Sequence, residues 1–228
     1  MYQFHWRTLF SFVLVICLIS GTVLRAQVND AGLWTSISVE TKVVKKVTAV
    51  FSQEFRLDED VTELGTYFTE AGIGYKINKY IQVSANYRFL QKRQIDDSYS
   101  TRHRFYLDVK FQKKIKPFQF QFRTRFQDQY ADIGRTPDGG IAEYYSRNKF
   151  SFKWDLDKRF TPYLSVELFS PLNYPREYAF DDIRNSVGME YSLSKHHNLD
   201  FFYMIQKQLN TSNPLTDYII GVGYLYQW

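Results

Sequence analysis

Few side chains in this sequence could do acid–base or nucleophilic chemistry. His103 follows Ser100 by three residues and lies between two arginines, and a histidine beside a serine can activate its hydroxyl as a nucleophile. An acyl-hydrolysing site built on a strand is expected to carry the two groups on adjacent positions of one face, for instance as His-x-Ser. The observed spacing departs from that pattern. Ser100 and His103 are therefore only weak catalytic candidates.

Metal and cofactor chemistry has even less support. His196 and His197 lie in the string Ser194-Lys195-His196-His197-Asn198, where no third ligand is near in sequence, so a solvated turn is favoured over a metal site. Cys17 is the only cysteine, which excludes an internal disulfide framework and a cysteine metal cluster. GxSxG, HExxH and phosphate-loop motifs are absent from the sequence. We expect no cofactor, no metal and no enzymatic activity.

Composition narrows the class of protein. Aromatic residues make up 18% of the 228 residues, charged residues 23%, and the formal charge is +5. A disordered chain would be poor in aromatic residues. The basic residues are dispersed and the charge is modest, so no nucleic-acid partner is expected.

The elements that must position these groups are β-strands. Polar and apolar residues alternate over long stretches, as in Phe118-Gln119-Phe120-Gln121-Phe122, which gives a strand one apolar and one polar face. Eleven such segments occur, near 31–42, 46–57, 64–77, 80–92, 102–113, 117–128, 144–156, 161–169, 181–193, 198–208 and 216–228. Most have about the 9–11 residues that a tilted strand needs to cross a bilayer.

The connections alternate between short turns and longer polar loops, such as 93–101 and 129–143. Outer-membrane barrels have this pattern, with short turns on the periplasmic side. The sequence therefore predicts an all-β protein, an antiparallel transmembrane β-barrel of 10–12 strands. Bacterial single-chain barrels have an even strand number, so ten or twelve is expected although eleven segments are found. Aromatic residues that open strands, among them Phe118, Phe160 and Tyr163, are expected to form the periplasmic aromatic belt.

The two ends of the sequence indicate export and membrane insertion. Arg7, an apolar run from Leu9 to Ile19 and Ala26 fit a signal peptide over residues 1–26, with the barrel domain over 27–228. The last strand alternates and ends on Trp228. Tyr224, Tyr226 and Trp228 resemble the terminal signal that the barrel insertion machinery recognises. We expect an outer-membrane location with outer-membrane lipid, lipopolysaccharide and that machinery as partners, and the sequence leaves the oligomeric state open.

Many charged residues fall on the polar faces of the strands and are expected to line the lumen: Arg88, Arg104, Lys110, Arg123, Arg125, Arg147, Lys149, Arg184, Glu70 and Glu190. One interpretation is a network of ion pairs and hydrogen bonds that fills a narrow interior. The other is a narrow pore whose basic residues favour anions.

Several short motifs also resemble a known family: Trp34, Gln53-Glu54-Phe55-Arg56, Gly74-Tyr75-x-Ile77-Asn78-Lys79-Tyr80 and Asn86-Tyr87-Arg88-Phe89. They are similar to an uncharacterised family of Gram-negative outer-membrane barrels known only as a domain of unknown function. The resemblance covers the chain after the signal, and it implies a small outer-membrane barrel without supplying an activity.

The sequence thus favours a small, non-enzymatic, porin-like outer-membrane barrel with a narrow-channel, ligand-binding or structural role. Two alternatives stay open at this point: an outer-membrane lipid-modifying enzyme of the deacylase or lipase type, and a soluble periplasmic ligand-binding barrel.

Overall fold

The computed structural model describes residues 28–130, 143–156, 159–172 and 179–228, and all regular structure in them is β-strand. The eleven strands are β1 Val28–Val44, β2 Val47–Asp58, β3 Glu63–Lys76, β4 Ile81–Arg93, β5 Tyr99–Ile115, β6 Phe118–Tyr130, β7 Glu143–Trp154, β8 Phe160–Pro171, β9 Asp182–Ser192, β10 His197–Gln208 and β11 Leu215–Gln227. Each predicted segment corresponds to one of these strands. The predicted signal peptide, residues 1–26, lies outside the described residues.

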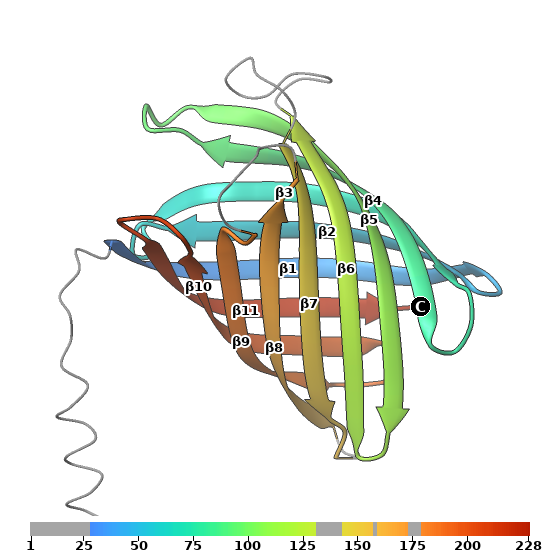
Figure 1. Cartoon of the computed structure of the whole chain (residues 1–228). Coiled ribbons are helices and arrows are strands. Elements are labelled where there is room, and N and C mark those ends of the chain that lie inside the picture. Colours follow the sequence, from blue (N-terminus) through green and yellow to red (C-terminus); the bar gives the residue numbers. More distant parts are fainter. Residues whose placement is uncertain (1–27, 131–142, 157–158, 173–178) are drawn as a thin grey trace, which may run out of the picture.

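The strands form one closed barrel in which each strand pairs with its neighbours in sequence, and β1 pairs with β11 (Figure 1). All pairs are antiparallel except the closing one, which is parallel from Val28 opposite Leu215 to Glu40 opposite Gln227. An up-and-down chain with an odd number of strands begins and ends in the same direction, so its closure has to be parallel. The expectation of an even strand number is therefore wrong, while the predicted range of 10–12 includes the observed eleven.

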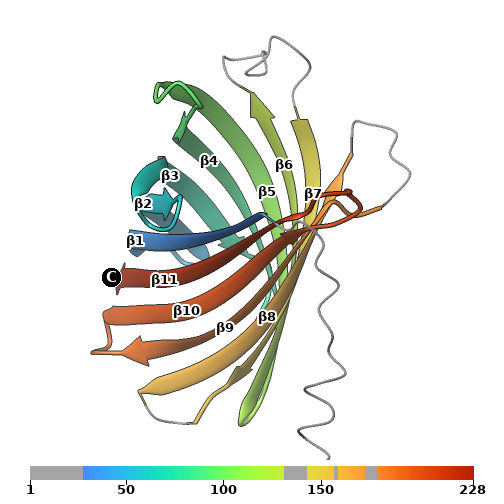
Figure 2. The ribbon, with the colours of Figure 1, turned by 90° about the vertical axis from the view of Figure 1, so that its left-hand side faces the viewer.

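The strands are strongly tilted. In Figure 1, β6 and β7 run steeply across the view while β1 and β11 run across it almost horizontally, as expected when a sheet closes with a large stagger between strands. Short turns such as Lys45–Lys46 lie at one end of the barrel, and the longer connections lie at the other. Figure 2 shows the barrel turned by 90°, with the strands arranged around the lumen.

The barrel is apolar outside and polar inside, the reverse of a water-soluble protein. Large hydrophobic side chains point outward and are exposed, for example Ile73 at 62% and Leu107 at 59%. The neighbours of these residues in sequence point inward and include Gly72, Gly74 and Asp108, as strand alternation requires. This arrangement, with strands of 11–17 residues, is that of a transmembrane barrel. No helix in the described parts of the chain is long and apolar enough to cross a membrane.

Inward glycines make room for large side chains in the lumen. A Cβ atom on Gly221 would lie 1.9 Å from the ring of Phe202, and one on Gly188 would lie 2.4 Å from the ring of Tyr163. Both distances are far below van der Waals contact. The two rings therefore occupy space that any other residue at these two positions would take.

Candidate functional site

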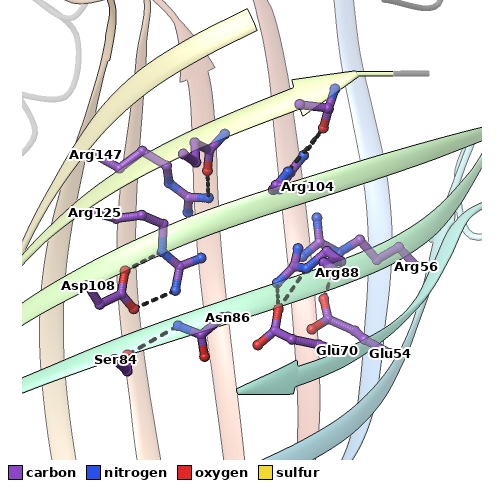
Figure 3. Close-up of polar contacts among 12 residues, drawn as sticks. Glu54, Arg56, Glu70, Ser84, Asn86, Arg88, Arg104, Asp108, Arg125 and Arg147 are labelled. Carbon is purple, nitrogen blue, oxygen red and sulfur yellow. Dashed lines mark hydrogen bonds and ion pairs between the residues drawn. The ribbon is translucent and has the colours of Figure 1, made fainter. Parts of the chain in front are cut away.

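The barrel interior holds a cavity of about 360 Å³ with an excess of positive charge, here called the cationic cavity. Eight cationic side chains line it: Arg56, Arg88, Arg104, Arg123, Arg125, Arg147, Lys149 and Arg184. Only three carboxylates, Glu54, Glu167 and Asp200, do so. The cationic residues come from six strands, β2, β4, β5, β6, β7 and β9. Each occupies one of the alternate positions whose side chains point into the barrel. Figure 3 shows five of these arginines with their partners.

Carboxylates on neighbouring strands hold several of these arginines in place. Arg125 donates from Nε and Nη2 to the two oxygens of Asp108 at 2.7 and 2.9 Å, a bidentate pair of the strong kind. Arg88 is bound to Glu70 at 2.6 Å (Figure 3). In both pairs the two residues lie directly opposite each other on paired strands, so strand register alone brings them together.

One carboxylate serves two arginines. Glu167 of β8 accepts from Arg147 at 3.0 and 3.1 Å and from Arg123 at 2.5 Å. Glu167 is only 5% exposed and Arg147 only 6%. Because two guanidinium groups share a single negative charge, this side of the lumen keeps an excess of positive charge.

Aromatic rings alternate with arginines around the wall. Three guanidinium groups lie 3.6 Å from ring centroids: Arg56 over Trp34, Arg88 over Phe68 and Arg125 over Tyr106. On the other side, Arg147 and Arg184 lie 4.3 and 4.7 Å from Phe169, and Arg184 also lies 5.2 Å from Trp34. We call the set the arginine–aromatic girdle: Trp34, Arg56, Phe68, Arg88, Tyr106, Arg125, Arg147, Phe169 and Arg184. Such contacts hold the cations in fixed positions without neutralising them.

Arg104 and Arg184 are bound to amides. Arg104 donates from both Nε and Nη2 to Oε1 of Gln129, the Nε bond being 3.0 Å long. Arg184 donates to Oε1 of Gln206 at 2.8 Å. Among the residues that the structure describes, no carboxylate forms an ion pair with either arginine. A neutral amide satisfies the donor without neutralising the positive charge, although Glu167 lies directly opposite Arg184 on β8.

A second cavity of about 490 Å³ lies on the turn side of the cationic cavity. Its lining is mostly hydroxyl and amide groups, among them Gln119, Gln121 and Asn198. Ser36 and Asp200 line both cavities, so the two spaces adjoin.

Tyr163 points into this lumen as well, where its hydroxyl donates to Asp200 at 3.0 Å. The prediction that Tyr163 belongs to the periplasmic aromatic belt is therefore wrong. Tyr163 lies directly opposite Gly188, a glycine of inward parity, so its ring lies on the polar face of β8.

A family model described as "Protein of unknown function (DUF2490)" matches residues 31–217. The chain belongs to this family. The match spans all eleven strands in whole or in part, so the resemblance read from Trp34 and the hairpin motifs is confirmed. No curated protein matches the chain.

Solved structures with a similar fold are outer-membrane barrels. The structure of NanC porin has a TM-score of 0.50 and 14% identity, and the alignment covers 77% of this DUF2490 chain and 85% of that one. The β domain of the Bordetella autotransporter BrkA follows with a TM-score of 0.40, 12% identity, and coverage of 75% and 78%. At such low identity the porin supports the barrel fold alone.

The structure brings most of the predicted lumen residues together. The cationic cavity takes seven of them: Arg88, Arg104, Arg123, Arg125, Arg147, Lys149 and Arg184. Lys110 and Glu190 line the second cavity, and Glu70 pairs with Arg88.

Ser100 and His103 are not brought together. Ser100 lies opposite Lys92 and His103 opposite Phe89 in an unbroken register, so the two side chains point to opposite faces of β5. His103 is on the outer face, where its Nδ1 lies 2.7 Å from the hydroxyl of Tyr87. This geometry gives the serine no histidine to activate it.

The histidine pair of the β9–β10 turn is bound to the last strand. Nδ1 of His196 lies 2.6 Å from the carbonyl oxygen of Gln227, and Nδ1 of His197 lies 2.5 Å from the hydroxyl of Tyr224. Within the described ranges, no group of three or more potential metal ligands comes together. The ring of Tyr226 is tilted against both histidine rings, with centroids 6.2 and 5.1 Å from those of His196 and His197, while Trp228 is 79% exposed at the end of the chain. The role of Tyr224, Tyr226 and Trp228 in insertion stays a prediction.

Sequence reasoning missed the inward aromatic residues Trp34, Phe68 and Phe169. A signal was present, because Phe68 and Phe169 each stand two residues from a lumen carboxylate, Glu70 and Glu167. Residues two apart on a strand share a face. Their position relative to these carboxylates therefore assigns Phe68 and Phe169 to the lumen, although their hydrophobic type alone does not.

Proposed function

We propose that this protein is a non-enzymatic outer-membrane barrel that forms a narrow pore favouring small anions. The observation that carries the proposal is the cationic cavity, in which eight cationic side chains outnumber both the three lining carboxylates and the two others, Glu70 and Asp108, that pair with Arg88 and Arg125. Rings of arginine and lysine are the usual basis of anion preference in pores. A confined, low-dielectric wall strengthens the field of such charges along the lumen.

The adjoining cavities supply the route. The second cavity continues from Ser36 and Asp200 toward the turns, and its polar lining, mostly hydroxyl and amide groups with a few charged residues, suits a hydrated solute. The arginines of the arginine–aromatic girdle line the cationic cavity, which adjoins this space. Because carboxylates or rings hold these arginines, the wall of the route is charged there and its cations are fixed in place.

The competing functions have less support. A lipid-modifying enzyme needs a nucleophile beside its base, and Ser100 and His103 point to opposite faces. A soluble periplasmic barrel would expose side chains such as Ile73 and Leu107 to water, at a cost of about 25 cal/mol for each Å² of apolar surface. The outer membrane is the environment that this surface fits.

The experiment combines heat-modifiable gel migration of the refolded protein with planar-bilayer recording of the folded band. A heat-dependent shift together with steady conductance supports the pore. A shift without conductance would show that the girdle plugs the barrel, and the pore proposal would fail. A protein that stays water-soluble without detergent and shows no shift would contradict the membrane location itself.

A further inference from the structure

Arg104 differs from the arginines around it in its counter-charge. Arg56, Arg88 and Arg125 have carboxylate partners in Glu54, Glu70 and Asp108. Arg104 lies directly opposite Arg88 on the neighbouring strand. Its hydrogen-bond acceptor is the neutral amide of Gln129. Among the described residues, Arg104 therefore has no ion-paired carboxylate, and it lies directly opposite a second guanidinium group.

Four more arginines, Arg56, Arg88, Arg125 and Arg147, line the same cavity as Arg104. Like charges directly across a strand pair destabilise a sheet, and a guanidinium group stays protonated in proteins. A mobile anion in the cavity would offset this repulsion.

Arg104 also remains accessible to such an anion. Arg88, Arg125 and Arg147 are 8, 7 and 6% exposed, while Arg104 is only partly buried and lines the cavity. Its bonds to Gln129 use two of five N–H groups. The other N–H groups have the planar fork geometry that matches a carboxylate or a phosphate.

We infer that the cationic cavity is a saturable binding site for a small oxyanion, a carboxylate or a phosphate, with the Arg104 guanidinium as its main anchor. The cavity volume of about 360 Å³ limits the ligand to a small molecule. The inference deepens the proposed function, because it names the class of anion that the lumen would hold. It does not require the pore to be open, since the site can fill from the turn side.

The test is isothermal titration of the folded, full-length barrel in neutral detergent with sodium phosphate and, separately, with sodium succinate. Sodium chloride at matched ionic strength provides the baseline. The variants are Arg104→Gln, which removes the charge, Arg104→Lys, which keeps the charge but loses the fork, and Lys113→Gln as the control. Lys113 is exposed on the outer face, opposite Phe120.

The expected result is saturable binding of at least one of the two oxyanions, weakened about tenfold or more by Arg104→Gln and unchanged by Lys113→Gln. The oxyanion that binds identifies the preferred chemistry. Should Arg104→Gln fail the heat-modifiability check for folding, Arg104→Lys serves instead and is expected to bind about threefold more weakly than the parent.

No saturable heat with either salt, or equal binding by the parent and Arg104→Gln, would overturn the inference. Conductance without oxyanion binding would refute the binding site and still support the pore. Oxyanion binding without conductance would refute the pore and still support the binding site.

Discussion

Arg88 and Arg104 face each other across β4 and β5, yet only Arg88 is paired with a carboxylate. The pair shows how the lumen combines fixed and available charge. Glu70 neutralises one guanidinium and holds it under the ring of Phe68, while Gln129 orients the other without neutralising it. The excess positive charge of the cavity is therefore built into particular strand positions.

The bidentate pair of Arg125 and Asp108 should be important for stability. Asp108→Asn leaves a 7%-exposed guanidinium without its carboxylate, and we expect the free energy of unfolding to fall by about 3 kcal/mol. The control is Lys114→Gln, because Lys114 pairs with Asp155 at the surface and is 45% exposed. That change should cost less than about 1 kcal/mol. Urea unfolding in lipid vesicles measures both, and equal costs would contradict the assignment.

The two faces of β6 should respond differently to a charge. Phe122 is 42% exposed on the outer face, and Phe122→Lys should cost roughly 2–4 kcal/mol if it lies near the bilayer midplane. Gln121 lines the second cavity, so Gln121→Lys should be tolerated. The same vesicle unfolding experiment compares them. Similar tolerance at the two positions would show that the outer face is not in lipid.

Gly221 and Phe202 should be energetically coupled. A Cβ at position 221 would lie 1.9 Å from the phenyl ring, so Gly221→Ala should destabilise the barrel by about 1–3 kcal/mol. Adding Phe202→Leu should recover much of that loss. Gly223→Ala is the milder comparison, since its Cβ would lie 3.1 Å from Oγ of Ser36. A double-mutant cycle on unfolding free energies checks the coupling, and additive effects would mean that the ring lies elsewhere.

The parallel seam can be tested by disulfide formation. Ile37 lies opposite Tyr224 across β1 and β11. In a chain that also carries Cys17→Ser, Ile37→Cys with Tyr224→Cys should cross-link in the folded barrel, because adjacent strands place register partners within disulfide reach. The control pairs Ile37→Cys with Tyr226→Cys, two residues out of register, and should stay reduced. Non-reducing gels report the outcome, and preferential cross-linking of the shifted pair would refute the seam.

Alternation along the chain was sufficient to predict every strand, including β6 from its run of Phe118, Phe120 and Phe122. The sequence predicts the number of barrel strands less well, because that number depends on how the first and last strands pair, and these strands are distant in sequence. Nothing near Ala31 or Tyr218 indicates that they pair in parallel. The expectation of an even number rests on the known bacterial barrels. It does not allow for the parallel pairing of β1 with β11, which closes a barrel with an odd number of strands.

The alternation of side chains along each strand also indicates which charged residues face the lumen, but it does not indicate which of them form ion pairs with one another. Arg123 and Glu167 are distant in sequence and on strands that are not paired directly, so their contact depends on the curvature of the wall. Trp34 lies directly opposite Arg56 on β2, but its contact with Arg184 of β9 joins strands that are not paired. Contacts between unpaired strands require the closed three-dimensional barrel.

The most direct test of the account is the reversal potential of the folded barrel in a planar bilayer under a KCl gradient. The cationic cavity predicts a reversal potential on the chloride side of zero, shifted toward zero by Arg104→Gln and unchanged by Lys113→Gln. A steady conductance that reverses on the potassium side, or one that Arg104→Gln leaves unchanged, would contradict the claim that the cationic lumen selects anions.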